Sequence, residues 1–290
     1  MATVSAAKRE SNSNLRPLRI IGEVLRWAFL ILWGLMTVLP LYWMLIGAFK
    51  DRVAVTKMPP VWFPSPIVMD GWVTLFTRGE PFRWIFNSGV MAVTVTATNL
   101  IFAAMAGYAF SKLKFPGRDR IFWAFMATMM IPGELTLIPL YLLVTDTLGL
   151  GNTYAALVIP NLVSVGSIFL MKQFIQSLPT SLMDAARIDG CSEFRVFWKV
   201  VLPLARPGLA VLAIFTFVGQ WSSFFWPLLV ANDKAHRVLQ VGLASFKYEN
   251  TTDYGAMMAG AVLAAIPIAI LFITMQKHFL KGITVGGMKG

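Results

Sequence analysis

Residues 179–207, PTSLMDAARIDGCSEFRVFWKVVLPLARP, form a polar, amphipathic stretch between two long apolar segments of the chain. Ser181 followed by Asp184 predicts a helix start closed by a capping box, and Ser192 predicts a second helix start. Gly190 between them supplies a permissive turn. The stretch is therefore expected to form two short helices joined at Gly190.

The second of these helices is predicted to carry one apolar and one charged face. Its apolar residues recur at steps of three and four, namely Phe194, Phe197, Trp198 and Val201. Such a helix pair has two interpretations. It is either a connector that lies in the membrane interface, or a knob that fits a groove on a soluble partner and transmits force.

The rest of the chain has the composition of a polytopic membrane protein. Hydrophobic residues make up 57% and charged residues 13% of the chain, and the mean hydropathy is +0.67; a soluble domain carries about 25% charged residues. The net charge of +11 does not indicate nucleic-acid binding, because the basic residues are scattered between apolar runs. Cys191 is the single cysteine, so no internal disulfide is expected.

Six apolar runs are each long enough to cross a bilayer of about 30 Å. They cover residues 27–49, 84–111, 121–145, 147–171, 207–232 and 254–276, with Glu134 inside the third and a turn expected over residues 146–153. The predicted fold is an all-α membrane protein with six transmembrane helices.

The basic residues predict the orientation of these spans. Most of the 25 Lys and Arg residues fall in the N-terminal segment, the C-terminal tail and the loops on the same side. The positive-inside rule then places both termini in the cytoplasm. This divides the chain into a cytoplasmic segment (1–26), a transmembrane domain (27–281) with a cytoplasmic loop (179–207), and a cytoplasmic tail (282–290).

The cytoplasmic loop carries a family resemblance. Asp184-Ala185-Ala186, Asp189-Gly190, Phe197, Leu202-Pro203 and Pro207 resemble the "EAA" loop of permease subunits of bacterial ABC importers. In that family the loop docks on a cytoplasmic ATPase. The resemblance implies coupling roles for Asp184, Ala185, Ala186, Asp189, Gly190, Phe197 and Pro203. The family's leading Glu is Asp184 here, and Asp184 is also open to the capping-box role.

Further motifs extend the resemblance over about residues 27–290. They include Gly107-Tyr108-Ala109-Phe110, Phe115-Pro116-Gly117-Arg118, Phe225-Trp226-Pro227-Leu228 and the tail from Lys281 to Thr284. Together they are similar to the carbohydrate branch, in particular to the smaller permease subunit of maltose-type (MalFG-type) transporters.

This resemblance implies an importer of a sugar or related solute, such as a polyol phosphate, in the bacterial cytoplasmic (inner) membrane. Its partners would be a second permease subunit, a dimer of ABC ATPase subunits and an extracytoplasmic solute-binding protein. ATP and Mg are expected on the partner ATPase, with no cofactor on this chain. No metal site is expected, because the two histidines, His236 and His278, lie far apart in the sequence.

Two groups of residues are candidates for the solute path. Glu134 is the single acid inside a predicted span, where carboxylates are costly and often functional; a structural bond or exposure at the outer end is the alternative. Polar and aromatic side chains that suit a sugar follow in the fifth span, namely Gln220, Trp221, Ser223, Phe224 and Trp226. For Trp226 the alternative is packing or a place in the aromatic belt at the membrane boundary. Asn99 and Asn161 are further pore candidates, equally explained as bonds between helices.

Two other functions are weighed against the importer subunit. An ion-coupled secondary transporter would need charge inside the membrane, and Glu134 alone offers it. A membrane enzyme would need a cluster of His, Cys or paired acids, which the sequence does not provide. We therefore do not expect an enzyme.

Overall fold

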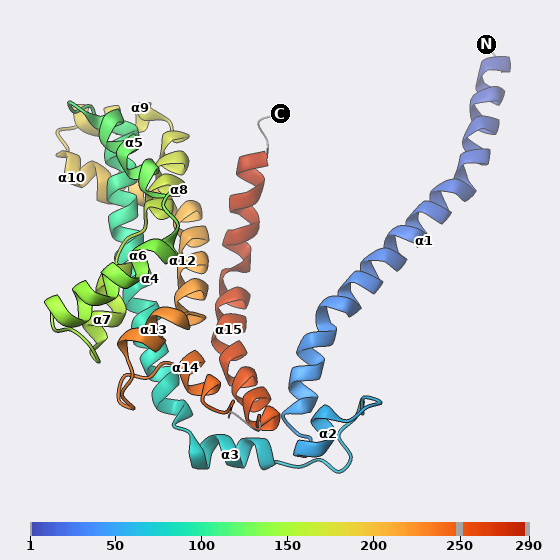
Figure 1. Cartoon of the computed structure of the whole chain (residues 1–290). Helices are drawn as coiled ribbons and strands as arrows, with labels where there is room; N and C mark the ends of the chain where they lie inside the picture. The colour runs from blue at the N-terminus through green and yellow to red at the C-terminus, as the bar shows by residue number, and fades with distance from the viewer. Residues whose placement is uncertain (1, 248–251, 288–290) are drawn as a thin grey trace. The chain divides into compact units, whose positions relative to one another are not determined.

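The computed structural model describes residues 2–247 and 252–287 (Figure 1). Within these residues every regular element is a helix, and one isolated bridge joins Lys247 to Thr252. Contacts divide the chain into two units. The first comprises Met1–Trp72 with Tyr254–Val262, and the second comprises Val73–Asp253 with Leu263–Gly290. The predicted all-α class is confirmed.

Among the described residues, three helices are long and apolar enough to cross a membrane unaided: Ile20–Gly47, Pro81–Lys112 and Tyr254–Gln276. Three further pairs of helices meet the same test only together, with bends of 92°, 45° and 76° at their breaks. Counting each bent pair as one span gives six crossings, the predicted number, although the third pair includes Glu193–Leu204 of the predicted cytoplasmic loop.

The bends have local causes in the sequence. The predicted run 121–145 is divided into α5 (Arg118–Thr128) and α6 (Gly133–Leu142), because Pro132 cannot continue a helix. The run 147–171 is divided into α7 (Tyr154–Val158), a 3₁₀ turn η2 (Ile159–Asn161) and α8 (Val165–Gln176), whose first turn is capped by Ser164.

The expected turn before α7 is confirmed. Residues 148–153 join the π-helical turn η1 (Leu143–Thr147) to α7. Gly149 and Asn152 have φ angles of 64° and 57°, in the left-handed region that these two residue types tolerate. Thr153 then caps α7 through its hydroxyl oxygen, which accepts the N–H of Ala156 at 3.2 Å.

The first unit contains α1 (Ala2–Gly47) and the short α2 (Arg52–Thr56). Lys50, between them, is buried; its Nζ lies 3.9 Å from the centre of the Trp43 ring and donates to the carbonyl of Val61. Burial lowers the pKa of Lys50. This lysine therefore fastens the proline-rich segment after α2 to the end of α1.

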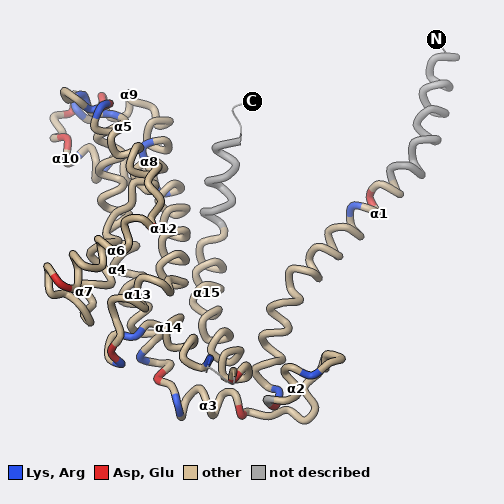
Figure 2. The backbone as a smooth tube through the Cα atoms, in the orientation of Figure 1, with Lys and Arg blue, Asp and Glu red and all other residues tan. Residues whose placement is uncertain are grey.

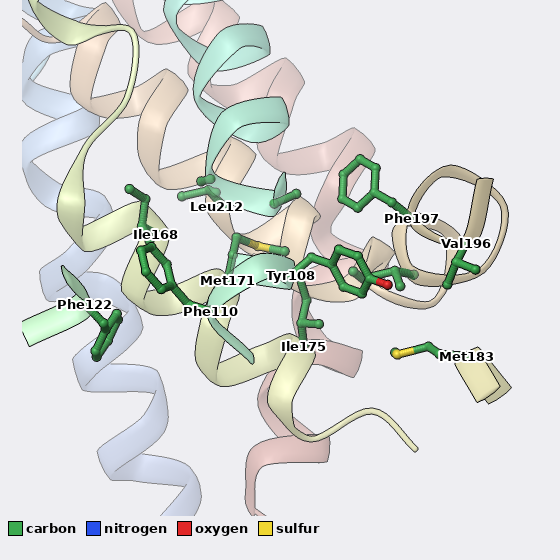
Figure 3. Packing of buried hydrophobic residues seen from close by; sticks show 14 residues of the cluster. Tyr108, Phe110, Phe122, Ile168, Met171, Ile175, Met183, Val196, Phe197 and Leu212 are labelled. Atoms are coloured by element: carbon green, nitrogen blue, oxygen red, sulfur yellow. The ribbon is translucent and has the colours of Figure 1, made fainter. Parts of the chain in front are cut away.

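In the second unit, α4 (Pro81–Lys112) packs mainly against α8 and α12 (Arg206–Trp221). The contact with α8 is close at Gly107, where an added Cβ would lie 2.8 Å from the main-chain atoms of Met171 and Lys172. A large hydrophobic cluster surrounds this contact and joins α4, α5, α8 and α12 to the loop helices (Figure 3).

The remaining helices are short, apart from the last. They are α3 (Asp70–Arg78), α9 (Thr180–Ile188), α10 (Glu193–Val196), η3 (Phe197–Val201), α11 (Leu202–Leu204), α13 (Phe225–Val230), α14 (Leu239–Ala244) and α15 (Tyr254–Gly287). The predicted tail 282–290 thus belongs to α15 up to Gly287, and residues 288–290 lie outside the described residues.

Asn87 fastens the far end of α4 to the segment before α14. Its Nδ2 donates to the carbonyls of Ala235 and Arg237, both at 2.8 Å, and its Oδ1 accepts from the hydroxyl of Tyr154 at 2.6 Å. Asn87 is fully buried, so these bonds satisfy an otherwise costly amide.

Charge follows the ends of this second unit. Lys, Arg, Asp and Glu gather at the end that carries α5, α9 and α10 and at the opposite end near α14, while the middle of α4, α8 and α12 carries none (Figure 2). This is the distribution expected of helices whose central parts lie in the hydrocarbon core.

Candidate functional site

The two predicted loop helices are present as α9 and α10, joined by a turn at Gly190 with φ 78°. Ser192 caps α10 as predicted, accepting the N–H of Arg195 at 3.4 Å. The predicted capping box of Ser181 is wrong, because α9 already begins at Thr180. Lys112 fixes this earlier start: its Nζ donates to the carbonyl of Leu178 at 2.6 Å and to the hydroxyl of Thr180 at 3.2 Å.

Arg187 is the centre of a polar network, the Arg187 network, that joins α9, α10 and α4. Its Nε donates to Glu193 Oε1 at 2.7 Å, its Nη1 to Asp184 Oδ1 at 2.7 Å, and its Nη2 to Tyr108 Oη at 3.3 Å. The Tyr108 hydroxyl in turn donates to Glu193 Oε2 at 2.6 Å. Asp184 is therefore engaged with Arg187 and does not close a capping box.

Glu193 and Arg187 stabilise each other's charged forms. The hydrogen bond from Arg187, followed by that from Tyr108, lowers the pKa of Glu193, and the bond to Glu193 raises the pKa of Arg187. The side chains of Asp184 and Glu193 remain 57% and 50% exposed, against 29% for Arg187. The mostly covered guanidinium of Arg187 is thus paired with two carboxylates that are at least half exposed.

Only half of the predicted apolar face of the second helix is covered by the protein. Phe197 and Val201 are buried in the cluster of Figure 3, where the Phe197 ring lies 5.8 Å from that of Tyr108. Phe194 is 66% exposed and contacts Trp198 at a ring distance of 6.0 Å. The predicted apolar stripe is therefore wider than its contact with the core.

The exposed residues of this region form what we call the coupling surface. It consists of two exposed apolar residues, Ile188 (86% exposed) and Phe194, and of the exposed polar residues and backbone around them. Of the sequence-predicted coupling residues, it includes Asp184, Ala185, Asp189 and Gly190; Pro203 is exposed farther along the chain, while Ala186 is half-buried and Phe197 is buried.

Sequence reasoning missed Arg187, Glu193 and Tyr108 as members of one site. The spacing of three residues between Asp184 and Arg187 predicts an ion pair on a helix. Nothing in the sequence places Tyr108, which lies 79 residues before Arg187, beside that pair. An apolar hollow of about 230 Å³ also opens here, between α4 and α10, with Phe194 and Phe197 in its lining.

A second site lies among α4, α8 and α12, and we call it the solute pocket. Its volume is about 390 Å³, and its polar lining consists of Asn99, Asn161, Ser164, Ser167, Thr216 and Gln220. It lies beside the break before α8, where irregular backbone at membrane depth is tolerated because it borders a cavity. The structure therefore brings predicted Gln220 together with Asn99 and Asn161.

The other solute-path candidates do not line this pocket. The indole N–H of Trp221 donates to Ala264 O at 3.0 Å, and that of Trp226 donates to Ala156 O at 2.9 Å. Ser223 and Phe224 lie in the break between α12 and α13, half-buried and 40% exposed respectively. Glu134 is exposed in the first turn of α6.

Among the residues whose side chains are described, no cluster of His, Cys, Asp and Glu could hold a metal ion. His236 pairs with Asp233, with 2.9 Å between Nδ1 and Oδ2. The side chain of His278 lies outside that description.

The comparison with protein families finds one match. The family model described as "Binding-protein-dependent transport system inner membrane component" covers residues 99–285, which include both the coupling surface and the solute pocket.

Two similar curated proteins cover nearly the whole chain. The arabinooligosaccharides transport system permease protein AraQ of Halalkalibacterium halodurans is 35% identical over 286 residues, covering 98% of this chain and 100% of the relative. The sn-glycerol-3-phosphate transport system permease protein UgpE of Yersinia enterocolitica is 31% identical over 278 residues, covering 93% and 97%.

A solved structure shares the fold. A chain of a bacterial ABC transporter involved in the import of the acidic polysaccharide alginate matches with a TM-score of 0.79 and 25% identity, covering 90% of this chain and 97% of that one.

Proposed function

The chain belongs to the family of binding-protein-dependent transport system inner membrane components, and on this premise we propose how it works as the permease subunit of an ATP-binding-cassette importer. It is a multi-pass membrane protein and a translocation subunit, not an enzyme, and it serves a transporter that uses a solute-binding protein. The ion-coupled alternative is discarded with this assignment.

The assembly and its location are part of the proposal. This subunit pairs with a second permease subunit in the bacterial cytoplasmic (inner) membrane, above a dimer of ATPase subunits that hold ATP and Mg. The loop 179–207 faces those ATPases. The solute is a sugar or a related compound, a class supported by relatives that transport arabinooligosaccharides and sn-glycerol 3-phosphate.

The coupling surface is the contact through which ATP hydrolysis moves the permease. One observation about the coupling surface carries this proposal. Its apolar residues Ile188 and Phe194 are exposed, while Arg187 joins the same helices to Tyr108 on α4. An exposed apolar patch rimmed by polar groups is typical of a protein contact. When the ATPase pair closes and moves α9, the network and buried Phe197 pass that movement to α4.

The test replaces one exposed residue without breaking an internal contact. Ile188→Asp puts a charge into the proposed interface. The matched control is Ile67→Asp, at an Ile that is 71% exposed between the predicted spans 27–49 and 84–111, on the side opposite the cytoplasmic termini. Purification of the tagged subunit from membranes should retain the ATPase subunits with Ile67→Asp and lose most of them with Ile188→Asp. Equal retention in both variants would refute the docking role of the coupling surface.

A substitution at Asp184 tests whether this residue takes part in coupling or only stabilises the loop. Asp184→Asn keeps the side-chain shape but weakens the bond to Arg187 Nη1, so it should lower the amount of solute transported per ATP while the ATPases stay bound. Unchanged coupling would limit Asp184 to a local structural role.

A further inference from the structure

The solute pocket has the position of a site on a transmembrane path. Asn99 lies near the middle of α4, the longest helix of the second unit's core, and faces residues of α8 and α12 across the cavity. Its volume of about 390 Å³ is within the range of small-molecule sites, which is about 300–1,000 Å³. The break between η2 and α8 opens it, with Ser164 and Ser167 on its wall.

The pocket wall includes one amide oxygen that has no partner in the protein. Asn99 is 2% exposed, and its Oδ1 has no hydrogen-bond partner. A buried amide without a partner costs about 1–3 kcal/mol, so natural proteins rarely leave one unless a water or ligand completes it. Ser164 and Ser167 pair with each other at 2.7 Å, while the lining also includes the amide of Gln220 and the hydroxyl of Thr216.

The same wall carries no charge. Its thirteen lining residues include no Lys, Arg, Asp or Glu. Two basic residues of the adjoining helices have partners elsewhere: Lys172 Nζ lies 3.8 Å from the centre of the Phe122 ring, and Lys112 Nζ donates to the carbonyls of Gln176 and Leu178. A phosphate or carboxylate that entered would be desolvated without a cation to compensate it.

We propose that the solute pocket binds a neutral, polyhydroxylated solute, such as one unit of an uncharged oligosaccharide, and disfavours phosphorylated or carboxylated solutes. This inference rests on the proposed function, because it makes the pocket part of the importer's path. Amides and hydroxyls match the alternating donors and acceptors of sugar hydroxyls, and a turn of the Asn99 amide toward the cavity would give its buried oxygen the partner that it lacks in the protein. Among the solutes of the relatives, arabinooligosaccharides fit this chemistry and sn-glycerol 3-phosphate does not.

Occupancy of the solute pocket can be tested directly with cysteines placed at two glycine positions. Gly219 lines the pocket and Gly89 does not, and an added Cβ at either position meets nothing within 4 Å. We would place a cysteine at each position in turn, in a Cys191→Ser chain within the assembled transporter and without the solute-binding protein. The labelling rate of this chain by a neutral maleimide is then measured by mass spectrometry.

The probes are arabinotriose, N,N′-diacetylchitobiose and glucose, with glucose 6-phosphate and sn-glycerol 3-phosphate as charged counterparts. The neutral sugars, glucose included, should slow labelling of Gly219→Cys severalfold and leave Gly89→Cys unchanged, whereas the phosphorylated probes should protect neither. Adding Asn99→Leu should weaken the protection about tenfold or more in probe concentration, because one hydrogen-bond partner is lost.

Two results would overturn the inference: no protection by any neutral probe, or protection by glucose 6-phosphate equal to that by glucose. If Gly219→Cys does not assemble, Thr216→Cys reports on the same cavity with a side chain of similar size. ATP hydrolysis stimulated by the solute-binding protein is measured on the same preparations. Stimulation without protection rejects the pocket but keeps the proposed function, and absence of stimulation in a transporter that carries the unchanged chain rejects the proposed function itself.

Discussion

Removing the guanidinium of Arg187 should weaken the connection between the loop helices and α4 while leaving both in place. Arg187→Met keeps much of the side-chain length and the packing of its stem but deletes the bonds to Asp184, Glu193 and Tyr108. Two of these are charge-assisted contacts of 2.7 Å. Tyr108 keeps its bond to Glu193, so no buried group is left entirely unpaired.

The free energy lost in Arg187→Met depends on how exposed the Arg187 network is to solvent. Pairs between exposed charges contribute about 0.2–1 kcal/mol, and two-pronged arginine–carboxylate bonds lie at the upper end. Arg187 reaches Glu193 through two nitrogens, at 2.7 and 3.2 Å, and is itself mostly covered. We therefore expect a coupling free energy of about 1 kcal/mol between positions 187 and 193, and a total loss of about 1–2 kcal/mol for Arg187→Met.

A double-mutant cycle measures this coupling. The cycle compares reversible unfolding in mixed micelles of Arg187→Met, Glu193→Gln and the double variant. The control is the ion pair between Arg118 and Asp119, which has an N–O distance of 2.9 Å but is more exposed, so its coupling free energy should be smaller. Free energies that add within about 0.3 kcal/mol for positions 187 and 193 would refute the network as a stabilising unit. Tyr108→Phe should separately lower the solute transported per ATP, with the ATPases still bound.

Three further predictions concern the second unit. Gly107→Val should prevent α4 from packing on α8, because its Cβ would meet backbone at 2.8 Å; we expect loss of the monodisperse subunit in size-exclusion chromatography, whereas Gly89→Val should retain it. The pKa of Glu193 lies below its ordinary value of 4.5, so the stabilisation it provides is complete above about pH 4.5 and is lost as the pH falls through the lower folded-state value. Unfolding followed from pH 7 to pH 3 should show a smaller acid-induced loss in Glu193→Gln, and equal losses would contradict this. Asn87→Leu should cost about 1–3 kcal/mol of unfolding free energy, since the carbonyls of Ala235 and Arg237 and the hydroxyl of Tyr154 lose their partner, and a Tyr154→Phe variant should cost less.

Much of the fold could be predicted because its signals are local. The length of the apolar runs, the left-handed turn at Gly149 and Asn152, and the cap at Ser192 each depend on a few neighbouring residues. The breaks at Pro132 and before α8 have equally local causes, but a hydropathy pattern reports only that the residues are apolar. Such a pattern cannot distinguish one straight helix from two bent ones.

The sites were less predictable, because they depend on contacts between distant segments. Gln220 and Asn99 lie on different helices, and only their packing with α8 shows that they share a cavity. Trp221 looked equally suited to a sugar, yet its N–H is used by the carbonyl of Ala264. The start of α9 was misplaced for the same reason: its anchor, Lys112, is 68 residues away from Thr180.

The two sites meet on one helix, and this suggests how they communicate. Tyr108, at the Arg187 network, and Asn99, in the solute pocket, are nine residues apart on α4, which is about 14 Å along a helix axis. No proline interrupts α4 between them, and Gly107 allows it to lie directly against the backbone of α8. A helix held this closely moves as a rigid body with its neighbour instead of bending. We therefore infer that a displacement of α9 and α10 reaches the pocket by moving α4 and α8 together relative to α12, which changes the width of a cavity that all three helices line.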